Sequence, residues 1–454
     1  MVFVSVNPAT GKRLRTYREH SPAQVAAAVG RAQAAFEDWR ALSFSARARR
    51  VRGVARALRT RHEELARLMT AEMGKPLAQA RAEIEKCALG CDYFARYTAT
   101  FLADERPPGA PKNARVAFAP LGLVLAVMPW NFPFWQVFRA AVPALMAGNV
   151  VLLKHSSNVG GCALAIENIF ARAGAPSHLL QTLLIPSDRV PGLIADPRVR
   201  AVTLTGSSAA GRQVAALAGA AMKKGVFELG GSDAYVILAD ADLDHAAQVC
   251  TAARLVNNGQ SCVAAKRFIV VDRVRAAFEK KFVAGMAAQR MGDPRDPAVG
   301  IGPLAREDLR ADLHAQVQES LRRGARLLLG GKIPPGPGFY YPPTVLTDVA
   351  RGMPAYDEEL FGPVAAIIPV RDEAGALAVA NGSLYGLGAA VFTESKRRAA
   401  VFARELDAGL VFVNDFVRSD PTLPFGGVKQ SGYGRELGPY GIREFVNIKT
   451  VVEA

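Results

Sequence analysis

One of the five cysteines, Cys262, lies in a short polar segment, NNGQSC, that precedes an apolar run. A thiol is a weak nucleophile at neutral pH until its pKa is lowered or a base removes its proton. No histidine lies near Cys262 in the sequence, so nothing suggests a Cys–His protease. By residue type alone, a cysteine of this kind is more often buried and inert than reactive. The segment is turn-like, however, and can leave the sulfur accessible.

A carboxylate, Glu228, ends the apolar run VFE and is followed closely by Gly230 and Gly231. A carboxylate in apolar surroundings needs a partner or has a raised pKa. The glycines allow the backbone or a ligand to approach closely. Glu228 is therefore either a salt-bridged strand end or a general base that activates a water molecule.

An isolated cation, Arg139, is the only charged residue between Arg115 and Lys154, inside the apolar stretch FWQVFRAAVPALM. A buried guanidinium needs an anionic partner. That partner is either a fixed Asp or Glu elsewhere or the carboxylate of a substrate, bound through two N–H groups. Trp135 lies four residues earlier, on the same helical face, and Ser419 could add a hydroxyl.

The elements that must position these residues begin with helices. Ser21 to Trp39 has a capping Ser, a Pro at the first helical position and apolar residues at helical spacing. Ser45–Leu68 and Met69–Tyr97 have the pattern of two further amphipathic helices. We therefore expect the first hundred residues to be helical and to carry little chemistry.

From Gly122 onward, short apolar runs alternate with helical stretches such as Ser208–Ala220. This alternation predicts a parallel, doubly wound sheet, and a second such block begins at Tyr235. Ligands of these sheets bind beyond the carboxyl ends of the strands. The residues expected at those ends are Asn131, Lys154, Gly206 and Glu228.

Composition restricts the function further. The net charge is +15, but no run of five basic residues occurs, so we expect no nucleic-acid partner. Cys87 and Cys91 could form half a metal site, yet no second pair completes it and we predict no metal. The uncharged stretch Val116–Phe138 is broken by prolines and glycine, which argues against a membrane span. With an odd number of cysteines and no signal-peptide pattern, we expect a cytoplasmic protein.

Five motifs resemble those of the aldehyde dehydrogenase superfamily, in its order and spacing and over nearly the whole chain. They are PWNFP, ELGGSDAYVI, NNGQSCVAAKRF, EELFGPV and PFGGVKQSGYGRELG. Within that family, LLKHSSNV and FVRSDPTLPFGG are similar to segments of the NADP-linked succinate-semialdehyde dehydrogenases. The resemblance implies an α/β fold with two doubly wound parallel-sheet domains plus a small strand element for oligomerisation. We place the cofactor domain at 1–227, with 106–121 contributing to the strand element, the catalytic domain at 228–425 and the oligomerisation tail at 426–454.

The resemblance also implies catalytic roles. Cys262 attacks the aldehyde carbon, and the Asn131 amide and the Cys262 backbone N–H stabilise the oxyanion. Glu228 then activates the water that hydrolyses the thioester. The alternatives are a dehydrogenase for another semialdehyde or an aliphatic aldehyde, and a non-catalytic binding protein on the same fold.

Cofactor contacts follow from the same resemblance. The segment GSSAAG matches neither GxGxxG nor a Walker loop and alone indicates only a helix cap. The resemblance makes it a pyrophosphate contact at a helix N-terminus. Ser157 stands where NAD-selective relatives carry Glu, so we predict NADP in preference to NAD. The expected cofactor contacts are Trp130, Lys154, His155, Ser157, Gly206, Ser207, Ser208, Leu229, Glu359 and Phe361.

For the substrate, the resemblance implies that Arg139 and Ser419 bind the distal carboxylate of succinate semialdehyde, and we expect Trp135 to contact the substrate as well. Thr422 departs from the pattern, because these relatives often have Arg there. The expected partners are the small aldehyde and further copies of the chain, as a homo-oligomer that is a dimer or a tetramer.

Overall fold

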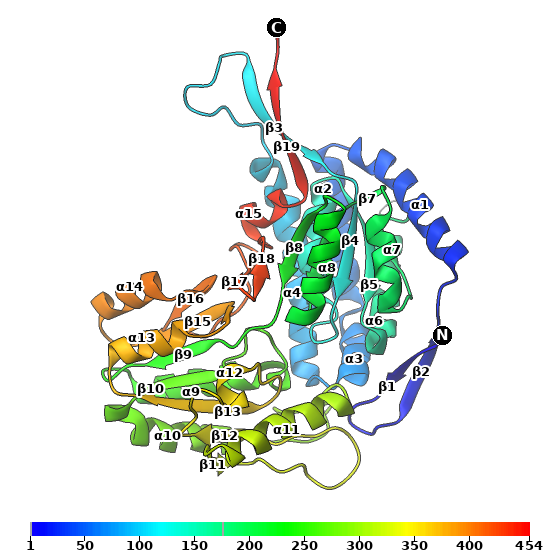
Figure 1. The fold of residues 1–454 in the computed structure, drawn as a ribbon. Coiled ribbons are helices and arrows are strands. Elements are labelled where there is room, and N and C mark those ends of the chain that lie inside the picture. Colours follow the sequence, from blue (N-terminus) through cyan, green and yellow to red (C-terminus); the bar gives the residue numbers. More distant parts are fainter. Residues whose placement is uncertain (1, 175–176) are drawn as a thin grey trace.

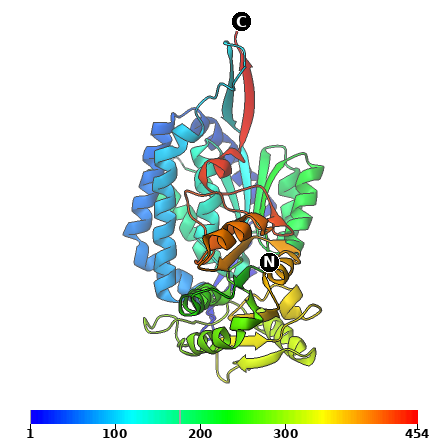
Figure 2. The same ribbon diagram turned by 90° about the vertical axis from the view of Figure 1, so that its left-hand side faces the viewer.

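The computed structural model describes residues 2–174 and 177–454. Two large, mainly parallel sheets form its body, each covered by helices, and a two-stranded arm projects from it (Figure 1). The arm also stands clear of the body in the perpendicular view (Figure 2). The predicted α/β class with two doubly wound sheets is confirmed.

The N-terminal region differs from the expectation in two respects. It begins with an antiparallel hairpin, β1 (Val2–Val6) and β2 (Arg13–Arg18), that the sequence analysis missed. In addition, three helices replace the two expected after the first one, because the helical run breaks at Arg61 and again at Gly74, whose φ is 79°, whereas the expected boundary between Leu68 and Met69 lies inside a helix. The helices are α1 (Pro22–Arg40), α2 (Phe44–Thr60), α3 (His62–Met73) and α4 (Leu77–Phe101).

The first large sheet has the strand order β18-β8-β7-β4-β5-β6, and all but β18 run parallel. Its strands are β4 (Leu123–Met128), β5 (Val150–His155), β6 (Leu180–Thr182), β7 (Val199–Thr205), β8 (Lys224–Glu228) and β18 (Gly432–Tyr433). Its helices are α5 (Trp135–Met146), α6 (Gly160–Arg172), α7 (Val190–Ala195) and α8 (Ser208–Ala220), with 3₁₀ turns at Ser157–Val159 and Ser187–Arg189. As predicted, Asn131, Lys154, Gly206 and Glu228 lie at or just beyond the carboxyl ends of these strands.

The second large sheet has the order β11-β12-β13-β10-β9-β15-β16, with only β11 antiparallel to its neighbour. Its strands are β9 (Ala234–Ile237), β10 (Arg267–Val271), β11 (Arg326–Leu329), β12 (Thr344–Thr347), β13 (Val364–Val370), β15 (Gly388–Phe392) and β16 (Leu410–Val413). Its helices are α9 (Leu243–Leu255), α10 (Asp272–Ala287), α11 (Glu307–Arg322), α12 (Pro354–Asp357), α13 (Glu373–Asn381) and α14 (Lys396–Glu405), with a 3₁₀ turn at Val256–Gly259.

The arm consists of β3 (Ala114–Pro120) and β19 (Val446–Val452), which pair antiparallel. We expected β19 to pair with another sheet edge, such as that of a neighbouring subunit, and here its partner is β3 of the same chain. The tail also contains β17 (Val428–Lys429), which pairs with β14 (Tyr385–Gly386), and α15 (Gly438–Arg443). Because β18 completes the first sheet, the tail belongs partly to the body of the molecule.

Within the described residues, no helix combines the length and the apolar character needed to cross a membrane. The uncharged stretch Val116–Phe138 divides into part of β3, all of β4 and the start of α5. It is thus a strand, a turn and a helix start, as its prolines and glycine predicted.

Candidate active site

Two pockets meet at Cys262, which alone among the described residues lines both of them. The strand-end pocket, about 260 Å³, lies at the carboxyl edge of the first sheet. It is lined by Pro129, Trp130, Asn131, Thr205, Gly206, Ser207, Leu229, Gly230, Leu309, Glu359 and Phe361. The helix pocket, about 290 Å³, lies between α4, α5 and the segment 416–425. Cys262 is partly buried and borders both pockets, unlike the other four cysteines, which are buried.

The loop before Cys262 is bent by three successive left-handed residues. Asn257, Asn258 and Gly259 have φ angles of 55°, 57° and 75°, a conformation that Asn and Gly adopt most readily. The Asn258 amide donates to the carbonyls of Gly74 and Pro303, at 3.0 and 2.9 Å. The sequence NNG thus has a physical reason: it forms a sharp turn that is fixed to the body.

A buried lysine, Lys266, holds the other side of the loop. Its ammonium donates to the carbonyls of Ser261 and Cys262, at 2.9 and 2.7 Å, and lies 3.4 Å from Glu359. Sequence reasoning missed this residue, although a lysine next to a predicted buried strand was a signal for it. Lys266 therefore fixes the backbone that carries the nucleophile.

The Cys262 thiol is protonated in this state, because burial raises its pKa to about 12. The charges of Glu359 and Glu228 raise the pKa further, whereas those of Arg139 and Lys266 lower it. Nucleophilic attack by Cys262 consequently requires a group that accepts its proton.

Asn131 is buried with its amide directed at the cysteine loop. Its side-chain Nδ2 donates to the Gln260 carbonyl at 3.1 Å, and its backbone carbonyl accepts from the Asn257 side-chain amide at 2.7 Å. An amide group held in this way is suited to donate to a developing oxyanion without moving far.

Glu228 is almost completely buried, and neither carboxylate oxygen has a hydrogen-bond partner among the described residues. Burial, and then the charge of Glu436, raises its pKa well above the usual value, while Arg139 and Arg435 act in the opposite direction. The salt-bridged interpretation of Glu228 is therefore wrong. A buried carboxylate with free oxygens has the environment of a general base for water.

The anionic partner of Arg139 in the structure is a fixed carboxylate, Glu436. The two side chains form a buried ion pair, and Arg139 also donates to Thr205 at 3.2 Å and lies over the Phe425 ring, 4.5 Å from its centroid. The sequence left open whether the partner was protein or substrate. Glu436 lies within the segment GRELG, and sequence reasoning gave this residue no role.

Several expected cofactor residues surround the strand-end pocket. Trp130 and Phe361 meet edge to face at 5.7 Å between ring centroids, and Glu359 accepts from the Gly231 N–H at 3.1 Å. A side chain at Gly230 would come within 2.6 Å of Glu359, so glycine keeps this space open. The wall of this pocket therefore combines two aromatic rings with the Glu359 carboxylate.

The N-terminus of α8 opens toward the same edge of the sheet. Ser207 caps the helix by accepting from the Ala210 N–H at 3.3 Å, and Ser207 and Gly206 line the strand-end pocket. Ser208 does not line it and donates to the Gln430 carbonyl at 3.3 Å. The first turn of α8 is suited to a phosphate group because it presents backbone N–H groups there.

Three expected cofactor residues lie farther along the edge, outside the strand-end pocket. The Lys154 ammonium donates to Ser187 at 3.1 Å, and Ser157 lies in the 3₁₀ turn after β5. His155 requires a correction: its Nε2 bonds to the Pro133 carbonyl and its Nδ1 accepts from the Ser156 N–H, both at 2.8 Å. No ring nitrogen of His155 is left for a cofactor, and burial lowers its pKa to about 4.

In the helix pocket, Trp135 and Ser419 contact each other, since the indole N–H donates to the Ser419 hydroxyl at 2.9 Å. Lys86 of α4, which sequence reasoning missed, donates to the same hydroxyl at 2.8 Å. Thr422 is turned to its own loop, where it donates to Asp420 at 2.6 Å, and it does not line the pocket.

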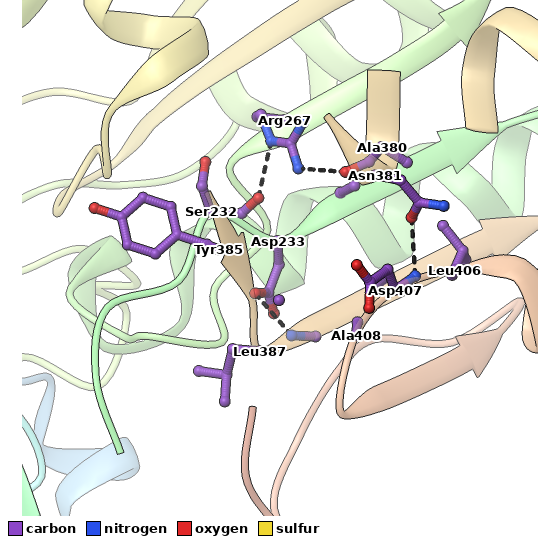
Figure 3. Close-up of a pocket in the computed structure, with 14 residues that line it drawn as sticks. Ser232, Asp233, Arg267, Ala380, Asn381, Tyr385, Leu387, Leu406, Asp407 and Ala408 are labelled. Carbon is purple, nitrogen blue, oxygen red and sulfur yellow. Dashed lines mark hydrogen bonds between the residues drawn. The ribbon is translucent and has the colours of Figure 1, made fainter. Parts of the chain in front are cut away.

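A further hollow, of about 10 Å³, is lined by Asp233 and residues around it (Figure 3). One oxygen of this buried carboxylate accepts from the Gly388 N–H at 3.1 Å, and burial raises its pKa to about 7. Arg267 closes one side by donating to the carbonyls of Ser232 and Ala380. The hollow has room for about one water molecule, so it is not a substrate site.

Comparison with known proteins agrees with this geometry. The aldehyde dehydrogenase family matches residues 2–451. A probable NADP(+) succinate-semialdehyde dehydrogenase of Synechocystis sp. is 49% identical over 99% of both chains. The NAD(P)+ succinate semialdehyde dehydrogenase Sad of Escherichia coli is 48% identical, over 99% of this chain and 97% of its own. A solved Streptococcus pyogenes succinic semialdehyde dehydrogenase, in complex with NADP+, superposes with a TM-score of 0.96 at 36% identity over 99% of both chains. The chain belongs to the aldehyde dehydrogenase family.

Proposed function

We propose that this protein oxidises succinate semialdehyde to succinate with NADP as the preferred electron acceptor. The observation that carries the proposal is the position of Cys262 where two pockets meet, one suited to a nicotinamide and the other lined by cationic and hydroxyl groups. The names of the relatives, at 48–49% identity over the whole chain, agree with it.

Catalysis begins when the Cys262 sulfur bonds to the aldehyde carbon and its proton passes to an acceptor. Glu228 and Glu359 are the carboxylates whose charges act on that sulfur. The Asn131 amide and the Cys262 backbone N–H would donate to the oxyanion, and loss of one such donor typically costs about 2.7–4 kcal/mol of barrier. NADP, when bound in the strand-end pocket, supplies the hydride acceptor for this oxidation.

Hydrolysis of the resulting thioester requires water, and Glu228 would remove a proton from it. The free oxygens of Glu228 support this role because no protein group competes for them among the described residues. Since its pKa is raised, the fraction of Glu228 able to accept a proton increases as the pH rises through that pKa.

Preference for NADP rests on Lys154 and Ser157. A lysine at the end of β5 attracts the 2′-phosphate, and a neutral serine three residues later does not repel it. The proposed contacts elsewhere are Trp130, Gly206, Ser207, Leu229, Glu359 and Phe361, which line the strand-end pocket.

Substrate selection is proposed to occur in the helix pocket, where Trp135, Arg139 and Ser419 contribute to the wall. We further propose a cytoplasmic homo-oligomer in which the arm of β3 and β19 contacts another subunit. Exposure of Ile448 and Val452 on the arm, at 58% and 62%, supports such a contact.

A panel of succinate semialdehyde, glutarate semialdehyde and butanal, each with NADP and NAD, tests the proposal. We expect the highest kcat/KM for succinate semialdehyde with NADP. Equal kcat/KM values for butanal and succinate semialdehyde would contradict the proposed substrate. A higher kcat/KM with NAD would contradict the proposed cofactor preference.

A further inference from the structure

A cation other than Arg139 is available in the helix pocket. Lys86, in the middle of α4, lines this pocket, and no carboxylate lies within ion-pair distance of it in the described ranges 2–174 and 177–454. Arg139, by contrast, is already paired with Glu436. The cation without an anionic partner is the one that a ligand carboxylate can neutralise.

The carboxylates closest in sequence to Lys86 have other partners, and the adjacent Glu85 pairs with Arg59. Glu83, one turn earlier on α4, accepts from the N–H groups of Phe134 and Trp135 through one oxygen, both at 2.9 Å. Its other oxygen forms the buried ion pair with Lys75. Glu83 thus fixes the start of α5 and does not pair with Lys86.

Lys86 and Ser419 keep free hydrogen-bond donors after the bonds that they make with each other and with Trp135 are counted. The Lys86 ammonium donates to the carbonyl and the hydroxyl of Ser419, at 2.6 and 2.8 Å, so one of its three N–H groups remains. The Ser419 oxygen accepts from both Lys86 and the Trp135 indole. Its own O–H has no acceptor in the described part of the chain, which gives two free donors for the two oxygens of a carboxylate.

The position of Lys86 is well defined. Its ammonium lies over the Trp135 ring, 4.6 Å from the centroid, so the side chain is held by a cation–π contact as well as by Ser419. Burial, followed by the positive charge of Arg139, lowers the pKa of Lys86 to about 8. The negative charge of a bound carboxylate would act against both effects and raise the pKa of Lys86.

We infer that Lys86, together with the Ser419 hydroxyl, binds the distal carboxylate of the substrate and so determines selection for carboxylated aldehydes. This inference rests on the proposed function, because it names the group that recognises the substrate in the same site. Arg139, paired with Glu436, contributes to the wall of the pocket and to its positive potential.

The test compares wild type, Lys86→Met, Lys86→Arg and the exposed control Lys396→Met on succinate semialdehyde and on butanal. Lys86→Met removes the charge and keeps the chain length. We expect its kcat/KM for succinate semialdehyde to fall about 10- to 100-fold, mainly through KM, because a charge-assisted bond to a non-reacting group is lost. Activity on butanal should stay within about twofold. A role for Lys86 in holding the Ser419 loop alone would lower both activities together and overturn the inference.

The pH dependence gives an independent measurement. Charges that act on Lys86 come from Arg139 on α5, from Glu83 and Cys87 on its own helix and from Asp420 in the facing loop. Because Lys86 is charged only below its pKa, the kcat/KM ratio of succinate semialdehyde to butanal should fall as the pH rises through about 8. In Lys86→Arg this fall should be absent, and its persistence there would assign it to another group.

Protection of Cys262 from iodoacetamide by succinate separates this inference from the proposed function. If wild type oxidises butanal as efficiently as succinate semialdehyde, the proposed function fails. The protection experiment still shows whether Lys86 binds a carboxylate, because it does not depend on turnover. We expect succinate to slow alkylation of wild type but not of Lys86→Met. Equal protection of both, or no protection of wild type, would overturn the inference.

Discussion

The two pockets that meet at Cys262 are built in different ways. The strand-end pocket is lined mainly by residues that follow strands of one sheet, with backbone and aromatic groups prominent in its wall. The helix pocket is lined by side chains of α4, α5, the cysteine loop and the segment 416–425. The topology of the first sheet determines the strand-end pocket. The helix pocket depends instead on the side chains that elements distant in sequence contribute to it.

This difference separates the chemistry of the site from its selectivity. Under the proposed function, the cysteine loop, Asn131 and Glu228 would provide a reaction that any aldehyde can undergo. Lys86, Trp135 and Ser419 would act only on the part of a substrate that does not react. Changes to the shared chemistry should therefore affect all aldehydes, whereas changes at one pocket should affect one ligand.

The largest effect should come from Cys262→Ala, which removes the thiol of the one described residue that lines both pockets. We expect kcat to fall by roughly 10⁴-fold or more for succinate semialdehyde and butanal alike, because no other group can form the covalent intermediate. NADPH absorbance measures this loss. Cys250→Ala, at a buried cysteine of α9 away from both pockets, should remain active, and a comparable loss there would weaken the assignment.

Glu228→Gln should act on both aldehydes as well, but at the later step. We expect about one NADPH per subunit to form rapidly, followed by turnover slowed by about 10²- to 10⁴-fold, since the thioester forms but its hydrolysis lacks a base. Rapid mixing and mass spectrometry of the acyl-enzyme check this. In wild type, hydrolysis should accelerate as the pH increases, because the raised pKa of Glu228 leaves it protonated at lower pH. A variant without a burst would place Glu228 before acylation.

Glu436→Gln should lower the stability of the protein, because Glu436 is the partner of Arg139 in the buried ion pair. Removing one partner leaves the buried Arg139 charge unpaired, and such a loss costs about 3–5 kcal/mol. A clear decrease in the thermal midpoint, measured by circular dichroism, is the expected result. Glu453→Gln, which removes an exposed partner of Arg115, should change the midpoint little. Similar midpoints for both variants would show that the buried pair contributes little.

The smallest effect should come from Ser157→Glu, at the far end of the cofactor edge. A carboxylate at this position should repel a 2′-phosphate and reduce the NADP-to-NAD ratio of kcat/KM about tenfold or more. Ser157→Ala keeps the position neutral and should leave the ratio nearly unchanged. Activity on butanal relative to succinate semialdehyde should not change in either variant, because the helix pocket is untouched.

Sequence reasoning predicted the residues around the strand-end pocket better than those around the helix pocket. Periodic apolar runs gave the first sheet, and the residues after its strands were thereby placed at one edge. Lys86 was missed because nothing in α4 indicates that residue 86 faces residue 419, more than three hundred positions later. Glu436 was missed for the same reason, since its partner Arg139 lies on α5.

Errors within the predicted part have local physical causes. The boundary between α3 and α4 was lost because apolar periodicity continues through Gly74, whose left-handed φ of 79° ends α3. His155 was assigned to the cofactor by its neighbours in sequence, although β5 turns its ring inward to the Pro133 carbonyl. The first outcome depends on the backbone angle of a single glycine and the second on a hydrogen bond between elements, and the apolar pattern along the chain contains neither.

The two-sided access to Cys262 has a consequence for the order of events during turnover. Cys262 is the one described residue that lines both pockets, so under the proposed function the dinucleotide and the acyl chain would occupy different spaces beside it. Exchange on one side can proceed while the other side remains occupied. The proposed function therefore predicts that spent dinucleotide leaves, and water enters beside the thioester, before the carboxylic acid is released.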